Sequence, residues 1–204
     1  EVEINWADSK GGFDYNIGMN FSTTKNKVVE LADKGQVLYG EGLKYGTEHF
    51  PTQTRVGKPI GAFYLYKTNG LFQSNEEARQ YVNADGDEYQ PFADAGDIRY
   101  VDVNGDGYID DDDKVYCGSG IPTLEVNLNF SAGYKGFDLS VVLGSAWGHK
   151  IYNGNKYFYE GMNSGSNFLT SSLNAWTPQN TNTNIPRAIF NDPNGNLKES
   201  DRFI

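Results

Sequence analysis

The sequence predicts an all-β chain of antiparallel strands with long loops and one short helix, and three observations support this. Apolar and polar residues alternate over residues 13–22, 124–134 and, except at Val142, 137–147. Such a period of two indicates strands that have one apolar face. Short turns at residues 9–12 and 135–136 join these runs into hairpins. Ser74 and Glu77 form a capping box ahead of a helix expected over residues 75–82, in which Glu77 would accept the Ser74 backbone N–H.

The expected strands are longer than the five or six residues usual in globular proteins. Runs of ten or more residues, as over 13–22 and 124–134, match the ~9–11 tilted residues that cross a bilayer. Aromatic residues near the strand ends, among them Phe13, Tyr134 and Trp147, suit the rims of an outer-membrane barrel. The alternation alone fits a soluble β-sandwich with one solvated face equally well. From residue 152 onward, Asn, Gly, Ser and Thr dominate, which predicts long loops.

Charge and composition exclude several classes of protein. The formal net charge is −10, and residues 85–113 account for all of it, with eleven acids and one base. An acidic chain does not suit nucleic-acid binding, which needs clustered Lys and Arg. The single cysteine, Cys117, excludes an internal disulfide framework. An aromatic content of 14% is too high for a disordered acidic tail.

The acidic segment contains a motif with the ligand spacing of an EF-hand loop. The predicted calcium ligands are Asp102, Asn104, Asp106, the backbone carbonyl of Tyr108, Asp110 and Asp113. Asp113 stands at the twelfth position, where a bidentate Glu is usual. Residues 96–101 read as a strand rather than a helix, so we expect a structural calcium ion rather than a switch. The alternative is a solvated acidic turn, because Asn-Gly and Asp-Gly pairs form turns without metal.

Catalytic signatures are weak, and we expect no enzyme. His49 and His149 lie 100 residues apart without a metal-motif partner, and Cys117 has no Cys–His signature. A hydrolase is therefore an unlikely reading. Several aromatic residues near a strand end or in the Asn-rich loops could instead stack on sugar rings, although rim anchoring or loop packing explains them equally well. These residues are Trp147, Tyr157, Phe158, Tyr159 and Trp176.

A set of motifs, in order along the chain, resembles the C-terminal part of SusC/RagA-type TonB-linked outer-membrane proteins. The motifs occupy residues 57–64, 66–73, 96–100, 102–110, 134–140 and 184–187. Together they run through almost all 204 residues. The resemblance implies that residues 1–204 are part of a 22-strand transmembrane β-barrel with long extracellular loops. It also implies that both ends are cut, with the plug and TonB-contacting segment upstream and the last strands downstream.

The resemblance further implies location in the outer membrane of a Gram-negative bacterium. There the whole protein would import oligosaccharides or peptides, with a SusD-type surface lipoprotein as lid and the TonB complex acting through the upstream regions. Lipid would contact the strands, and no nucleic acid is expected as a partner. The alternative function is a soluble, calcium-stabilised β-sheet module that binds carbohydrate.

Overall fold

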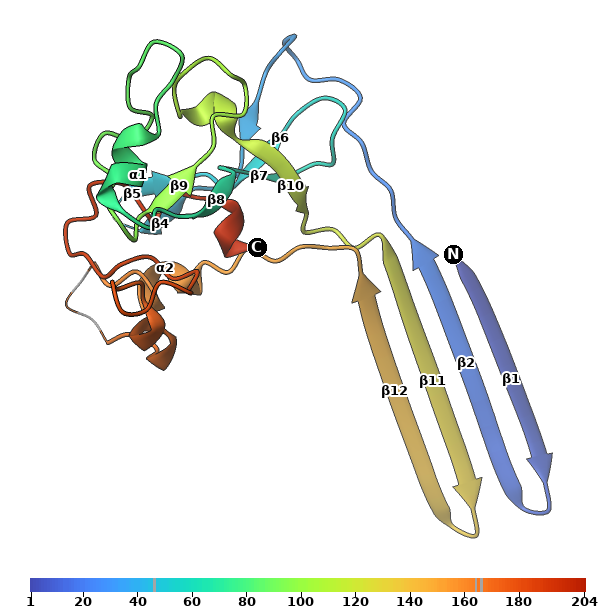
Figure 1. The fold of residues 1–204 in the computed structure, drawn as a ribbon. Coiled ribbons are helices and arrows are strands. Elements are labelled where there is room, and N and C mark those ends of the chain that lie inside the picture. Colours follow the sequence, from blue (N-terminus) through green and yellow to red (C-terminus); the bar gives the residue numbers. More distant parts are fainter. Residues whose placement is uncertain (46, 164, 166) are drawn as a thin grey trace. The chain divides into compact units, whose positions relative to one another are not determined.

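The computed structural model describes residues 1–45, 47–163, 165 and 167–204. The chain divides into two compact units, each described here by itself (Figure 1). Unit 1 comprises Glu1–Gln36, Arg55–Ile60 and Gly118–Lys150. Unit 2 comprises Val37–Thr54, Gly61–Cys117 and Ile151–Ile204.

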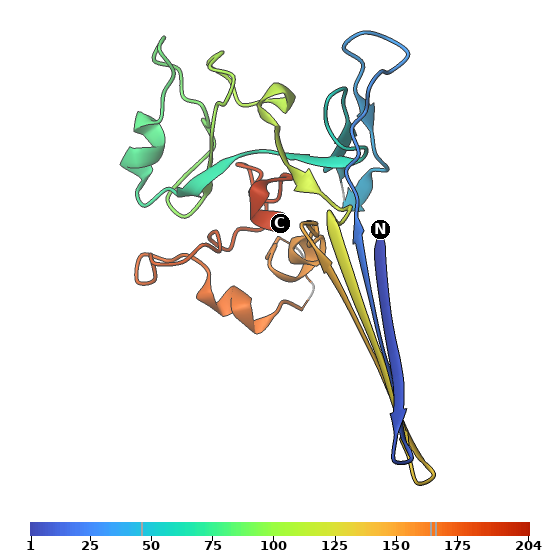
Figure 2. The ribbon, with the colours of Figure 1, turned by 90° about the vertical axis from the view of Figure 1, so that its right-hand side faces the viewer.

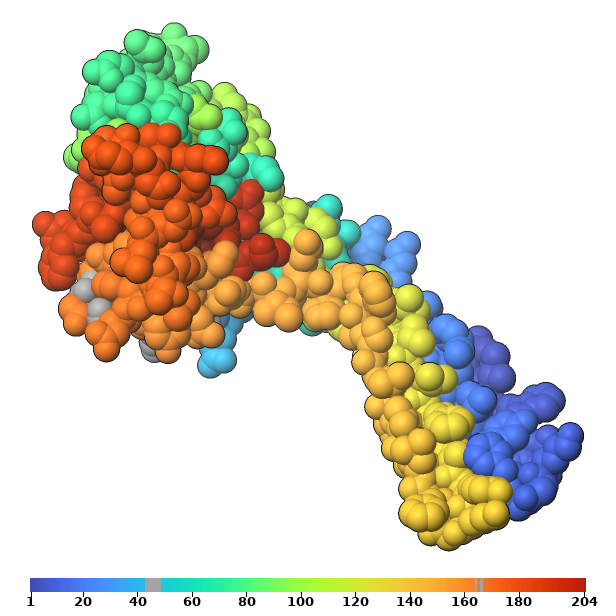
Figure 3. Space-filling model, turned by 60° about the horizontal axis from the view of Figure 1, so that its bottom comes forward, coloured from blue at the N-terminus to red at the C-terminus, as the bar shows by residue number. Residues whose placement is uncertain are grey.

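Unit 1 is built on a four-stranded antiparallel sheet in the order β1-β2-β11-β12. Its strands are β1 (Val2–Lys10), β2 (Phe13–Thr23), β11 (Leu124–Tyr134) and β12 (Phe137–Trp147). Figure 2 shows this sheet edge-on as a single layer. Figure 3 shows its strands side by side, blue for β1 and β2 and yellow for β11 and β12. The expected hairpins are therefore confirmed, and β11 pairs with β2 to join them.

The register of unit 1 places the apolar residues in rows across all four strands. One row holds Ile4, Met19, Leu128 and Leu143, and the next holds Trp6, Ile17, Phe130 and Val141. Because side chains alternate between faces, Asn, Ser and Gly fill the rows between them. The predicted two-faced pattern is thus present. Its expected exception also holds, because Val142 pairs with Asn129 and is 72% exposed.

Both hairpins of unit 1 close through two-residue turns. Lys135 and Gly136 have φ angles of 49° and 84°. Positive φ at both central residues is the type I′ geometry, which matches the twist of the flanking strands. In the first hairpin, Ser9 and Lys10 belong to β1, so the turn is shorter than the predicted four residues and consists of residues 11–12.

Unit 2 contains short strands and irregular segments, as expected for the middle of the chain. One sheet has the order β10-β7-β6-β3, and β4-β5 and β8-β9 form two-stranded sheets. The strands are β3 (Leu38–Tyr39), β4 (Leu43–Tyr45), β5 (Thr47–His49), β6 (Thr52–Thr54), β7 (Ala62–Leu65), β8 (Thr68–Leu71), β9 (Ile98–Tyr100) and β10 (Val115–Ser119).

The helices of the described chain are short. The predicted helix is α1, Asn75–Gln80, two residues shorter than expected. Ser74 accepts the Glu77 N–H at 3.1 Å, but the Glu77 carboxylate accepts the Gln73 N–H at 2.6 Å rather than that of Ser74. A second helix, α2 (Asn155–Tyr159), lies where only loop was expected. Three 3-10 helices span Asp111–Asp113, Thr170–Asn174 and Asp201–Phe203. No helix among the described residues is long and apolar enough to span a membrane.

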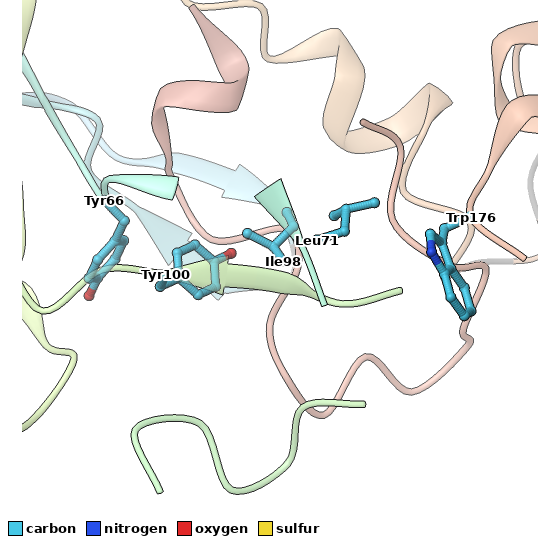
Figure 4. Packing of buried hydrophobic residues seen from close by; sticks show 5 residues of the cluster. All are labelled: Tyr66, Leu71, Ile98, Tyr100 and Trp176. Carbon is cyan, nitrogen blue, oxygen red and sulfur yellow. The ribbon is translucent and has the colours of Figure 1, made fainter. Parts of the chain in front are cut away.

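The main apolar cluster of unit 2 gathers residues from distant parts of the sequence. Figure 4 shows Tyr66, Leu71, Ile98, Tyr100 and Trp176 packed along β8 and β9. Each is at most 8% exposed. A second cluster of Phe72, Ala78 and Ala93 buries one side of α1. Because Trp176 belongs to the long C-terminal segment, burial of its ring attaches that segment to the strands.

Candidate functional site

The acidic loop after β9 has its local structure set by its own side chains. Asp102 accepts the N–H groups of Gly105 and Gly107 at 2.6 and 3.0 Å. Asn104 accepts the Asp106 N–H, and Asp106 accepts the Tyr108 N–H, each at 2.9 Å. Asx turns of this kind fold the chain tightly around its own oxygen atoms. Burial would raise the pKa of Asp102, but these backbone hydrogen bonds outweigh it and lower the pKa.

Asp113 closes the same loop from its far end and is fully buried. Its Oδ1 accepts the N–H groups of Val103 and Asn104 at 2.7 and 3.3 Å, and its Oδ2 accepts the Asp110 N–H at 2.9 Å. Asp110 in turn caps the 3-10 helix by accepting the Asp112 N–H at 2.9 Å. Hydrogen bonds to an ionised carboxylate are stronger than neutral ones. The residue at the twelfth position therefore organises the loop through backbone amides.

The predicted calcium ligands share this loop, but their acidic side chains do not converge. Within the described residues, no three His, Cys, Asp or Glu side chains are placed to hold a metal ion together. The predicted set also includes the Asn104 amide and the Tyr108 carbonyl, which are oxygen ligands that calcium accepts. Each carboxylate oxygen that takes one N–H keeps a second lone pair. Calcium binding by Asp102, Asn104, Asp106, Tyr108, Asp110 and Asp113 stays a prediction.

A buried network of charges ties the acidic loop to the core of unit 2. Asp111 accepts the Tyr66 hydroxyl at 2.8 Å and pairs with Lys114 at 2.9 Å. Lys114 also binds Glu199 at 2.7 Å, and Glu199 contacts Nδ1 of His49 at 2.8 Å. Sequence reasoning treated His49 as an isolated residue. Its partner lies 150 residues away, so no local signal could have revealed the pair.

These contacts shift the ionisation of the network. Burial would raise the pKa of Glu199, but its hydrogen bonds with His49 and Lys114 and the charge of Lys114 lower it to about 2. Burial would lower the pKa of Lys114, but Glu199 and Asp111 raise it. Burial and the adjacent Asp111 carboxylate raise the pKa of Tyr66. At neutral pH the network therefore holds two carboxylates against one ammonium, with His49 beside them.

Two of the recognised motifs, residues 96–100 and 184–187, meet in the centre of unit 2. Arg187 donates from Nε and Nη2 to the two carboxylate oxygens of Asp97, at 2.7 and 2.9 Å. Asp97 is fully buried and also accepts the Asn196 amide at 2.9 Å. Gly96 has a φ of +88°, and a Cβ there would lie 2.5 Å from the Trp176 ring. Glycine is therefore required both by the backbone and by the close approach of Trp176.

Side-chain amides occupy one edge of β9 next to this ion pair. Gln90 donates to the Ile98 carbonyl and accepts the Tyr100 N–H, both at 2.8 Å. Asn196 accepts the Ile98 N–H at 2.8 Å, and Asn194 donates to the Ile98 carbonyl at 3.1 Å. All three amides are at most 7% exposed. They satisfy the backbone groups that a further strand would otherwise pair with.

The structure does not gather the predicted substrate-binding aromatics into one site. Trp147, 61% exposed, ends β12 in unit 1, whereas Tyr157, Tyr159 and Trp176 belong to unit 2. Tyr159 is 46% exposed, but Tyr157 is half-buried and packs edge-on against His49 at 5.5 Å. Trp176 is only 8% exposed and donates to Gln73 at 3.2 Å. Its ring is a core group, which leaves little of it to contact a ligand.

Sequence reasoning missed a cavity of about 560 Å³ beside α2. Charged side chains line it, and their chemistry was not evident from local spacing. They are Lys156, Glu160, Asp201 and Arg202, next to Thr68 and Asn184. The volume lies within the range of small-molecule sites. Arg202 is 10% exposed and contacts Glu160 at 3.3 Å, so the two charges are held largely out of water.

Comparison with known proteins identifies the type of sequence. No family model matches the chain. TonB-dependent receptors P3 and P26 of Formosa agariphila are each 30% identical to it, over 176 and 181 residues, which is 86% of this chain. The chain corresponds to a segment of TonB-dependent receptors. TonB-dependent receptor P39 of the same organism is 28% identical over 169 residues.

The match covers only part of these relatives. The chain spans 17% of the length of receptors P3 and P26 and 15% of receptor P39. Their names are those of receptors, which agrees with the expectation that the chain is not an enzyme. Antiparallel strands also make up most of the regular structure found here, as a segment of such a receptor requires.

The Asp97–Arg187 pair yields a prediction about the C-terminal segment. Arg187→Ala leaves a buried carboxylate without its partner, which costs roughly 3 kcal/mol. Local opening of residues 151–190 in the full-length receptor should then be about 100-fold more populated. Limited proteolysis under native conditions measures this as faster cleavage in that segment. Lys67→Ala is the control, because the Lys67 side chain, paired with Asp201, is 55% exposed and such a pair contributes little. Equal cleavage rates in the two variants would contradict the prediction.

The lowered pKa of Glu199 yields a prediction about pH. A carboxylate whose folded pKa lies below its unfolded value stabilises the fold above the unfolded value, near 4.5. This contribution, roughly 3 kcal/mol, is lost as the pH falls from 4.5 towards 2. Denaturation of the full-length receptor, followed by tryptophan fluorescence, should show the loss. Glu199→Gln should flatten the profile over this range, whereas the exposed Glu30→Gln should not. Identical profiles for wild type and Glu199→Gln would refute the assignment.

Proposed function

We propose that this chain supplies late barrel strands and extracellular loops of a TonB-dependent outer-membrane transporter of the SusC/RagA type. The similarity to three TonB-dependent receptors supports the general class. The SusC/RagA motifs, spread from residue 57 to residue 187, support the subtype. In the whole protein the strands of unit 1 belong to a barrel of about 22 strands, which is the size class with a plugged lumen.

The sheet of unit 1 is the observation that carries this proposal. Its strands are 9 to 11 residues long, the length of tilted transmembrane strands. The rows of Ile4 and Trp6 expose apolar side chains, with Trp6 63% and Leu143 56% exposed. A soluble sandwich would cover such a face with a second sheet, whereas lipid covers it in an outer-membrane barrel. This favours the transporter over the soluble carbohydrate-binding module.

The connections between strands give the orientation. Two-residue turns join β1 to β2 and β11 to β12 at one end of the sheet. The connection from β2 to β11, residues 24–123, leaves from the other end. Outer-membrane barrels have short turns on the periplasmic side and long loops on the extracellular side. Unit 2, which consists of these long segments, therefore faces the medium in this proposal.

The imported nutrient is an oligosaccharide or a peptide, and a SusD-type lipoprotein closes over it. Exposed rings such as Tyr159 and Phe158 suit stacking on sugar rings. The cavity beside α2 adds acid, base and amide groups that hydrogen-bond to hydroxylated ligands. The TonB complex supplies energy through upstream parts of the receptor.

The lipid-facing assignment can be tested by paired substitutions in β11. Leu128 lies in the apolar row between Met19 and Leu143, and Asn127 lies on the opposite face. Leu128→Arg in the full-length receptor should cost about 2–4 kcal/mol if this residue faces the bilayer centre. Folded, heat-modifiable receptor in the outer membrane should then fall several-fold, while Asn127→Arg should assemble near the wild-type level.

The same two strains test transport. Growth on the oligosaccharide or peptide that the receptor imports should fall with the amount of folded Leu128→Arg receptor, and growth on a porin-permeable monosaccharide should not change. A SusD-type lipoprotein should co-purify with wild type and with Asn127→Arg. Equal assembly of the two variants would refute the membrane placement. Normal growth without the receptor on every polymer and peptide tested would refute the transport role.

We also propose that the loop over residues 102–113 binds one structural calcium ion through the predicted ligands. The spacing of oxygen side chains and the Asx turns that already fold the loop support this. A divalent cation would offset the repulsion among the four carboxylates of this set. It would bind the folded loop in preference to the unfolded chain and so stabilise it.

Chelation tests the calcium ion. Calcium at 100 times its Kd should stabilise the full-length receptor by about 2.7 kcal/mol relative to chelator. Thermal unfolding should therefore shift downward with EGTA. Asp106→Ala should remove the shift, whereas Asp112→Asn, which changes an exposed neighbour outside the ligand set, should keep it. An unchanged Tm with chelator would refute the proposal.

A further inference from the structure

Charges are segregated along unit 1 in a way that the alternation of the strands does not explain. The strand segments 1–23 and 124–147 carry six acids and two bases. The parts of unit 1 beyond the open strand ends, residues 24–36, 55–60, 118–123 and 148–150, carry six bases and two acids. Unit 1 as a whole is neutral, so opposite charges have been separated within one body.

Four exposed lysines form the part of this charge next to the strands, and we call them the basic collar. They are Lys25, Lys27, Lys58 and Lys150. Lys25 lies two residues beyond the end of β2, and Lys150 lies three residues beyond the end of β12. Within the described residues, Lys25, Lys27 and Lys150 form no ion pair with any acid of the chain.

Backbone hydrogen bonds hold the collar segments against the open end of the sheet. Thr24 donates to Thr123 at 3.1 Å, and Lys150 donates to Ser119 at 2.7 Å. Val28 donates to Lys58 at 2.9 Å, which places the segment of Lys27 beside the turn over residues 55–60. The four ammonium groups therefore belong to ordered backbone at the strand ends.

The collar is on the same side of the chain register as the apolar rows. In β2 the apolar face carries the odd-numbered residues from Phe13 to Phe21, and Lys25 and Lys27 continue that odd register. The acids near the same strand ends behave differently. Glu3 and Glu125 occupy the register of the polar face, where Glu3 accepts the Asn5 amide at 2.8 Å. Positive charge thus lies beyond the apolar face and negative charge along the polar one.

We propose that the basic collar binds the phosphate groups of anionic lipids in the leaflet at the open end of the strands. This inference rests on the proposed membrane placement of unit 1. A lysine just outside a lipid-covered surface can lay its aliphatic stem along the apolar zone and put its ammonium at the headgroups. Exposed Trp147, at the end of β12, marks the same level, as interfacial tryptophans do. At the turn end, Lys10 and Lys135 are offset by Asp8, Asp14 and Asp138, so the attraction is specific to one leaflet.

Lipid binding by the full-length receptor in a non-ionic detergent tests the proposal. The probes are short-chain phosphatidic acid, phosphatidylcholine of the same chain length, and inorganic phosphate, each followed by native mass spectrometry and by Tm. The test variant is K25Q/K27Q/K150Q, and the matched control is K10Q/K135Q at the turn end. Each lysine near an anionic surface contributes about 1 kcal/mol, or fivefold in affinity. The triple variant should therefore bind phosphatidic acid about 100-fold more weakly, and the control should bind as wild type does.

Each result decides between the collar and its alternatives. Phosphatidic acid should raise the Tm of wild type more than phosphatidylcholine does, and 0.5 M salt should weaken the effect. Unchanged phosphatidic acid binding by the triple variant, or an equal loss in the control, overturns the proposal. Inorganic phosphate acting as well as the lipid also overturns it in favour of a free-anion site. A triple variant that is less stable without lipid indicates pairing with acids elsewhere in the receptor and overturns it as well. Failure of the membrane placement is separate, because wild type itself would then lack heat-modifiability.

Discussion

The buried carboxylate of Asp97 is the interaction on which unit 2 depends. A fully buried carboxylate is costly unless it is paired and hydrogen-bonded. Here Arg187 binds both of its oxygens, Asn196 donates to one, and the Asp94 N–H donates to the other at 2.9 Å. These donors come from three separate parts of the chain. The polar centre can therefore form only when the segment after β12 has folded back onto β9, which gives the long C-terminal segment a single position.

The packing around this centre explains how a region rich in polar residues folds at all. Trp176 covers the glycine turn before Asp97, and Arg187 reaches the same turn, with its backbone N–H on the Gly96 carbonyl at 2.9 Å. The acidic loop is attached a short distance away through Asp111, Tyr66 and Lys114. Unit 2 thus combines two small apolar clusters with ion pairs that connect distant segments. This is the economy expected where strands are too short to form a large core.

The fold was predictable from sequence where a local period decided it. Strict alternation located β2, β11 and β12, and two-residue turns located the hairpins, because side-chain direction in a strand depends only on position along the chain. The capping box located α1. In contrast, α2 has no side-chain cap and begins at Asn155, inside a stretch whose composition resembles loop, so tertiary packing rather than local propensity defines it. Pairing of β2 with β11 also required contacts across about 100 residues, which no local pattern reports.

The site was predictable to a smaller degree for the same reason. The acidic loop could be found because its oxygen atoms are close in sequence, whereas His49, Lys114 and Glu199 meet only in the folded chain. The burial of Trp176 was equally hidden, since an aromatic residue among Asn and Thr reads as exposed.

The row of amides beside β9 has a consequence for how the receptor behaves at a crowded cell surface. A short strand with free backbone groups is a template on which strands of other molecules can add. Gln90, Asn194 and Asn196 already occupy those groups on β9, and each of these amides is itself buried. An incoming strand would have to expel three satisfied side chains before it formed one hydrogen bond. The external part of the receptor is thereby protected at this edge against self-association and fibril growth.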